Sequence, residues 1–268
     1  RFFFNMTEEE IGLYEIKRRK VAYITLNRPE MAHSFDWDMM VAFREALKKA
    51  DHDEKVKCIV LQSTGDGAFS AGIDIKATTP DDVEYMEKMR KIGRENTQYM
   101  LLMKKPIIAS VQGSAIGYGM EILMACDLTI FADKPMDEMF FRMPEIAISI
   151  YPQTGATILP LLAFGLNYAK QILLTSDKFG LQELKNVNFP TRVVPPEELR
   201  KETRKFVRTF SKRDHSFTFL IKSSLTIMHN KMIERWFDLE DECGKVAYED
   251  RTMEELQEFI EDLRDRYP

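Results

Sequence analysis

The chain has 268 residues, of which 44% are hydrophobic and 30% charged, as expected of a globular protein with a sizeable core. Its net charge of −5, with acidic and basic residues intermingled, argues against nucleic acid as a partner. No apolar run is long enough to span a bilayer, so no membrane partner is expected either. The opening residues 1–5 are too short for a secretory signal, and Met6 is a candidate natural start.

The cysteines, Cys58, Cys126 and Cys243, are widely spaced and form no Cys-x-x-Cys pair. This spacing favours neither a disulfide framework nor a zinc site, and it fits a reducing, cytoplasmic location. The histidines show no metal-ligand spacing such as His-Glu-x-x-His. We therefore expect no metal and no other cofactor.

The first elements in chain order are two strands, residues 11–17 and 21–26, in which apolar and polar residues partly alternate. The basic run at residues 17–20 is expected to be a solvated hairpin tip. Apolar residues at three- and four-residue spacing predict an amphipathic helix over residues 36–50. The short apolar run at residues 56–61 predicts a buried strand.

The middle of the chain continues this alternation. Residues 80–103 predict a long helix that ends before Pro106, and residues 107–111 predict the next buried strand. A glycine-rich turn then runs into a helix at residues 120–126, followed by a strand at residues 128–132. Strands and helices in this order predict a mainly parallel α/β core.

After Pro195 and Pro196 the sequence pattern predicts helices only. The division expected from this break is an α/β core over residues 1–195 and a helical region over residues 196–268. The expected helices of that region are residues 197–210, 217–230, 233–248 and 253–266.

The glycine-rich stretch from Gly113 to Glu121 reads Gly-Ser-Ala-Ile-Gly-Tyr-Gly-Met-Glu. Its small residues let backbone N–H groups approach a ligand, and the following helix directs its positive dipole end to the same place. Developing negative charge on a carbonyl oxygen would be stabilised there. Apolar neighbours should raise the pKa of Glu121 towards that of an acid–base catalyst. The alternative is that Glu121 only complements the helix dipole.

Two further features carry candidate chemistry. Residues 68–75, Ala-Phe-Ser-Ala-Gly-Ile-Asp-Ile, follow a buried strand and offer a second backbone N–H; the alternative is an ordinary strand-exit loop. Glu145 comes directly after Pro144 in an apolar run; the alternative is a helix N-terminal Pro-Glu pair.

In this order and spacing, the three features resemble the enoyl-CoA hydratase/isomerase family, also called the crotonase family. Residues 26–30, Leu-Asn-Arg-Pro-Glu, are similar to the end of that family's N-terminal strand. Residues 125–128, Ala-Cys-Asp-Leu, are similar to its Cys-Asp segment. The resemblance covers about residues 21–194, and the C-terminal helices match in pattern more than in residues.

The resemblance implies a spiral of ββα turns with C-terminal helices that form a homotrimer, or a homohexamer of two trimers. It implies an enoyl-CoA hydratase, a lyase that adds water across the α,β double bond of an acyl-CoA thioester through an oxyanion-stabilised enolate. The backbone N–H groups of Ile73 and Tyr118 would form the oxyanion hole. Glu121 and Glu145 would be the two catalytic carboxyls.

The resemblance also implies which residues lie against the substrate and its coenzyme A moiety. They are Arg28, Ala71, Gly72, Asp74, Ile75, Lys76 and Gly117. Arg264 is a further candidate, reaching the coenzyme A of a neighbouring subunit. Arg28, Lys76 and Arg264 could equally be solvated surface residues.

Two departures from the family pattern bear on the reaction. Tyr118 stands where the family usually has glycine, and Gln153 lies in a stretch that is normally glycine-rich. They keep open an enoyl-CoA isomerase or a hydrolase of β-dicarbonyl C–C bonds, besides a non-catalytic binding protein of the same fold. Methionines of the long helix, such as Met100, are either an adaptable acyl pocket or core filler.

Overall fold

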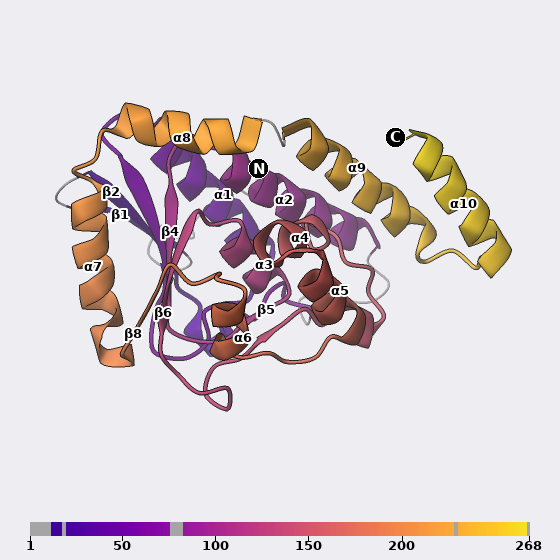
Figure 1. Ribbon diagram of the computed structural model, residues 1–268, viewed down its shortest axis with the longest axis horizontal. Helices are drawn as coiled ribbons and strands as arrows, with labels where there is room; N and C mark the ends of the chain where they lie inside the picture. The colour runs from indigo at the N-terminus through magenta and orange to yellow at the C-terminus, as the bar shows by residue number, and fades with distance from the viewer. Residues whose placement is uncertain (1–11, 18–19, 76–82, 228–229, 267–268) are drawn as a thin grey trace, which may run out of the picture.

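The computed structural model describes residues 12–17, 20–75, 83–227 and 230–266, which form an α/β fold with helices at the C-terminal end (Figure 1). In these residues the larger sheet has the strand order β1-β2-β3-β4-β6-β8. Its strands are β1 (Gly12–Lys17), β2 (Val21–Leu26), β3 (Cys58–Ser63), β4 (Ile107–Val111), β6 (Leu128–Ala132) and β8 (Arg192–Val194). β1 and β2 pair antiparallel and the other neighbours pair in parallel, so the predicted mainly parallel α/β core is confirmed.

A second, two-stranded sheet lies beside the first. It pairs β5 (Ala115–Ile116) in parallel with β7 (Phe141–Arg142). An isolated parallel bridge joins Ser70 to Ala115. The loop after β3, the loop after β4 and the segment before residue 145 are thus brought to one place.

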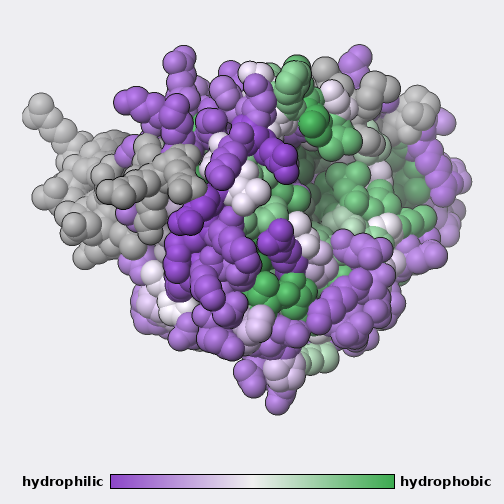
Figure 2. Space-filling view, turned by 60° about the vertical axis from the view of Figure 1, so that its left-hand side comes forward, coloured by the Kyte–Doolittle hydropathy of each residue, from purple (hydrophilic) through white to green (hydrophobic). Residues whose placement is uncertain are grey.

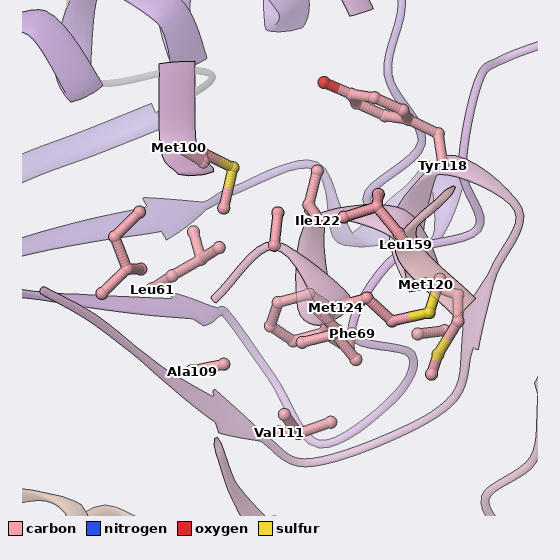
Figure 3. Packing of buried hydrophobic residues seen from close by; sticks show 14 of the residues in the cluster. Leu61, Phe69, Met100, Ala109, Val111, Tyr118, Met120, Ile122, Met124 and Leu159 are labelled. Carbon is pink, nitrogen blue, oxygen red and sulfur yellow. The ribbon is translucent and has the colours of Figure 1, made fainter. Parts of the chain in front are cut away.

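Helices cover one face of the larger sheet and enclose the main core. They are α1 (Trp37–His52), α2 (Val83–Leu102), α3 (Tyr118–Met124), α4 (Ile158–Phe164), α5 (Leu166–Thr175) and α6 (Leu181–Asn186). The start of α1 is fixed by Asp36, whose side chain accepts a hydrogen bond from the backbone N–H of Met39 (2.9 Å). Figure 3 shows core side chains from β3, β4 and α3 converging between the layers, including Leu61, Val111 and Ile122.

The opposite face of the sheet is covered by α7 (Leu199–Phe210), which lies against the strands at the left of Figure 1. Leu199 and Val207 of this helix are buried in a second, smaller cluster with Val60 and Ile130 of the sheet. Apolar side chains on both faces explain why β3, β4 and β6 are nearly continuous hydrophobic runs.

Three further helices follow: α8 (His215–Ile227), α9 (Asn230–Val246) and α10 (Met253–Arg266). Lys222 of α8 is buried and its amine donates to Asp127 (2.8 Å), which fixes α8 to the loop before β6. Arg266 of α10 pairs with Glu242 of α9. Among the described residues, no helix is long and apolar enough to cross a membrane.

The sequence left open whether the methionines of α2 form an acyl pocket or fill the core. Met89, Met100 and Met103 are almost fully buried in the main cluster, which supports their role as core filler. Met86 is only partly buried. The predicted hairpin between the first two strands is present, but Arg18 and Arg19 at its tip lie outside the described residues.

Candidate active site

Two loops lie side by side beyond the carboxyl ends of β3 and β4. The backbone N–H of Ile116 donates to the carbonyl oxygen of Ser70 (3.0 Å). Gly72 permits this approach, because its φ is +86° and a Cβ there would lie 2.5 Å from the carbonyl oxygen of Ile116. The same Cβ would lie 3.1 Å from the backbone nitrogen of Tyr118, so the segment of Gly72 and Ile73 adjoins the first residue of α3.

The backbone N–H groups of Ile73 and Tyr118 donate no hydrogen bond within the described part of the chain. The next residue after Ile73 does donate: the N–H of Asp74 bonds to the carbonyl oxygen of Phe35 (2.8 Å). Tyr118 opens α3, where the first N–H groups have no helical partner and carry the positive end of the dipole. Both N–H groups are therefore able to donate hydrogen bonds to a developing oxyanion.

Glu121 lies in the first turn of α3 and is 3% exposed. Burial raises its pKa well above that of an ordinary glutamate, and the nearby carboxyl of Glu145 raises it further. The Thr154 hydroxyl donates to Oε2 of Glu121 (2.5 Å), which opposes this rise. The predicted rise in the pKa of Glu121 thus has burial as its main cause.

Glu145 begins the short 3₁₀ turn η2 (Glu145–Ile148), directly after Pro144. Its Oε1 would lie 3.2 Å from a Cβ on Gly117, which places the carboxyl beside the N-terminus of α3. Its Oε2 is buried and has no hydrogen-bond partner in the described part of the chain. Burial raises the pKa of Glu145 to about 7, so this carboxyl can exchange a proton near neutral pH.

A third buried carboxyl, that of Glu240 on α9, lies next to this pair. It accepts hydrogen bonds from the backbone N–H groups of Gly155 and Thr157, both at 2.8 Å. Burial nevertheless raises the pKa of Glu240 to about 7, and its charge contributes to the raised pKa of Glu121. Neither Glu240 nor Thr154 was a candidate from the sequence, because their partners are distant along the chain.

The side chain of Tyr118 is packed in the core rather than directed at the carboxyls. Its ring is 2% exposed and meets Phe35 edge-on, with the ring centroids 5.1 Å apart. Its hydroxyl donates to the carbonyl oxygen of Gly93 on α2 (3.3 Å). The phenol therefore bonds to the backbone of α2 rather than to Glu121 or Glu145.

Gln153 likewise contacts the helices that surround the site. Its Oε1 accepts from Arg90 of α2 (3.3 Å), and its amide lies against Gly244 of α9. Its Nε2 is buried without a hydrogen-bond partner in the structure.

The residues expected at the coenzyme A moiety lie around the first loop. Arg28 donates to Asp74 (2.9 Å) and forms an ion pair with Asp36 (3.2 Å), so its guanidinium is partly used in holding this loop. Ala71 is partly buried and Ile75 is exposed.

Two further candidates for contact with coenzyme A are Lys76 and Arg264. Lys76 lies outside the described residues. Arg264 is exposed on α10, at the far end of the C-terminal region.

The chain is similar to known proteins in both sequence and fold. Residues 17–267 match the model of the family described as Enoyl-CoA hydratase/isomerase. The chain belongs to this family. The expected crotonase fold is likewise confirmed, because the chain shares its fold with solved structures of enoyl-CoA hydratases.

Three relatives illustrate the similarity. The crotonyl-CoA hydratase of Syntrophomonas wolfei is 28% identical over 91% of this chain and 93% of its own length. The short-chain-enoyl-CoA hydratase of Clostridium acetobutylicum is 30% identical over 68% of this chain and 69% of its own. A probable enoyl-CoA hydratase from Mycobacterium thermoresistibile has a crystal structure that superposes with a TM-score of 0.77 at 26% identity, covering 88% of this chain and 96% of that one.

Proposed function

We propose that the chain is an enoyl-CoA hydratase, a lyase that adds water across the α,β double bond of an acyl-CoA thioester. The observation that carries the proposal is the convergence of two backbone N–H groups, unpaired among the described residues, with the carboxyls of Glu121 and Glu145, whose pKa values are both raised. Membership of the family and relatives named crotonyl-CoA and short-chain-enoyl-CoA hydratase support it. The proposed chemistry uses no cofactor, since coenzyme A is part of the substrate.

In the proposed mechanism, the thioester carbonyl oxygen accepts hydrogen bonds from the N–H groups of Ile73 and Tyr118. These donors stabilise the enolate that forms when the oxygen of water attacks Cβ. Glu121 takes a proton from the water, and Glu145 gives its proton to Cα. Glu121 and Glu145 together hold one proton throughout. Hydration starts with this proton on Glu145, and the reverse dehydration starts with it on Glu121.

The test of this proposal is hydration of crotonyl-CoA, followed by loss of the absorbance of the conjugated thioester. An enoyl-CoA series of increasing chain length defines the acyl specificity. A β-diketone tests the hydrolase alternative in the same assay format. Absence of hydration across the whole series would overturn the proposal.

Double-bond isomerisation is the second candidate reaction, because the same carboxyls can move a proton between carbons. We expect Glu121→Gln to reduce hydration more than isomerisation of a 3-enoyl-CoA. Activation of water requires Glu121, whereas a proton shuttle along the acyl chain can use Glu145 alone. Both rates are measured on the same variant, and an equal loss in the two assays would contradict this division of roles.

We further propose that the chain forms a homotrimer, or a homohexamer of two trimers. We also propose a cytoplasmic location. The trimer is supported by apolar side chains that α8 leaves exposed. The location is supported by Cys58, Cys126 and Cys243, which are all free thiols.

A further inference from the structure

The turn after the second acid is held by α9, a helix from the far end of the chain. Glu240 is 2% exposed, and its two oxygens accept from the backbone N–H groups of Gly155 and Thr157, each at 2.8 Å. The Thr157 hydroxyl also donates to Glu240. These bonds join residues more than eighty positions apart in the sequence.

Neighbouring residues of α9 fix the same turn from other sides. Trp236 donates through its ring N–H to the hydroxyl of Thr157 (2.8 Å). Phe237 lies against Gly155, where a Cβ would come within 3.1 Å of the ring. Arg94 of α2 pairs with Asp238 (2.6 Å) and so anchors α9 itself. The carboxylate of Glu240 is therefore part of a rigid attachment rather than a mobile surface group.

Thr154 lies within the turn that Glu240 holds. Its φ is +66°, a left-handed conformation that a β-branched residue adopts only when its surroundings impose it. Its hydroxyl donates to Glu121 at 2.5 Å, and its methyl group packs against Gly93 of α2. The backbone anchors at Gly155 and Thr157 come one and three positions after Thr154, so they fix the direction of its side chain.

We propose that Glu240 is a positioning residue of the acid–base pair: it fixes the turn of residues 153–157, and through Thr154 it orients the carboxyl of Glu121. The positioning of Thr154 is a property of the folded protein alone. Its consequence for catalysis rests on the hydratase function proposed above. The experiments below test the two parts separately.

The first experiment needs no substrate and uses methyl NMR of threonine-labelled protein. The signal of the Thr154 methyl group is identified by its loss in Thr154→Val. This methyl group and the Tyr118 ring both lie within 4 Å of the place where a Cβ on Gly93 would sit, so its chemical shift reports its position beside the ring. Glu240→Ala should shift or broaden this signal, whereas Glu234→Gln, an exposed change on the same helix, should leave it in place.

The second experiment is a double-mutant cycle in steady-state hydration of crotonyl-CoA. Glu240→Gln should lower kcat roughly tenfold, as for the loss of one hydrogen bond, with KM changed less than about twofold. In the Thr154→Val background the same substitution should change kcat less than about twofold, because its route of action is already removed. Glu234→Gln should retain the wild-type kcat.

The outcomes separate the inference from the function. An unmoved Thr154 methyl signal in Glu240→Ala, or additive effects of Glu240→Gln and Thr154→Val on kcat, would overturn the inference even in an active hydratase. If the wild type hydrates no enoyl-CoA, the methyl experiment still decides the positioning role. If Glu240→Ala does not fold, Thr157→Val removes one donor to Glu240 and should shift the Thr154 methyl signal in the same direction.

Discussion

At the scale of single residues, Glu145 is partly buried, and its buried oxygen Oε2 has no hydrogen-bond partner among the described residues. Burying an unpaired polar atom lowers stability, so this oxygen is available to a substrate rather than used by the fold. Glu121, in contrast, is already bound by Thr154. The two carboxyls of the pair thus differ in how much of their hydrogen-bonding capacity the protein itself uses.

We expect Glu145→Gln to lower the rate of crotonyl-CoA hydration by about 10²–10⁴, because glutamine keeps the shape of the side chain but transfers no proton. The variant should fold normally, as judged by circular dichroism and thermal unfolding. Glu138→Gln, at an exposed position nearby, is the control and should retain full activity. Near wild-type activity in Glu145→Gln would remove this residue from the mechanism.

The same residue should make stability depend on pH. Burial raises the pKa of Glu145 from about 4.5 to about 7, so the folded protein binds this proton more tightly than the unfolded chain does. The contribution of Glu145 to the stability of the folded protein is therefore largest below about pH 4.5 and is lost as pH rises to about 7. Glu145→Gln should be more stable than wild type at pH 8, by up to about 3 kcal/mol, and the difference should shrink towards pH 5.

Thermal unfolding of wild type and variant, at one protein concentration and over this pH range, measures the difference directly. Glu240 titrates in both proteins, so its contribution largely cancels in the comparison. Removing the Glu145 charge also lowers the pKa of Glu121, which adds to the stability of the variant at high pH. A variant less stable than wild type at pH 8, or a difference that does not vary with pH, would contradict the raised pKa.

At the scale of elements, Tyr118 joins α3 to α2 next to the acid–base pair. Its ring fills the space between Phe35 and Gly93, and Thr154 closes the same space from the other side. We propose that this packing limits the room beyond the carboxyls for a long acyl chain. The backbone N–H of Tyr118 remains available regardless of the side chain.

We expect Tyr118→Ala to extend hydration to longer enoyl-CoA substrates and to lower stability by about 3–5 kcal/mol, as for other buried aromatic truncations. Tyr118→Phe should lose only the hydrogen bond to Gly93, costing about 0.5–1.5 kcal/mol with an unchanged chain-length preference. Rates across the enoyl-CoA series and denaturant unfolding give both quantities. An unchanged preference in a folded Tyr118→Ala would show that the ring does not limit the acyl pocket.

The elements also show what the sequence alone can and cannot predict. The buried strands Val21–Leu26, Ile107–Val111 and Leu128–Ala132 were predicted with their observed bounds, because each is an apolar run with polar residues or proline at its ends. The short helices of residues 158–186 were not predicted, because each has only a few turns and depends on packing for its stability.

The same limit applies to the candidate site. Glu121, Glu145, Ile73 and Tyr118 lie in local patterns that a single sequence displays. Glu240 does not, since its partner Gly155 is 85 positions away and nothing near Glu240 in sequence indicates burial of its carboxyl.

At the scale of the whole molecule, α8 carries an apolar face that the other described residues leave exposed. Phe217, Leu220, Ile221 and Leu225 recur at three- and four-residue spacing, and each is more than half exposed. Figure 2 shows hydrophobic side chains gathered around a hollow on one side of the molecule, rimmed by hydrophilic ones. An exposed apolar helix face such as that of α8 is typical of an interface between subunits.

We expect light scattering at micromolar concentration to give a mass of three or six chains. Leu220→Glu combined with Leu225→Glu should dissociate the assembly, because it places charges in the centre of the apolar face. Lys212→Glu, an exposed change before α8, is the charge control and should keep the wild-type mass. A stable wild-type monomer would contradict the proposed trimer.

The attachment of α9 to the turn of residues 153–157 has a consequence for how the protein is made. Synthesis proceeds from the N-terminus, and Glu145 and Glu121 are translated long before Glu240. The nascent chain therefore carries both carboxyls before the helix that fixes their neighbouring turn exists. Completion of the site therefore waits for synthesis of α9 rather than for folding of the sheet. A chain interrupted before α9 would contain the whole sheet and an unfinished acid–base centre.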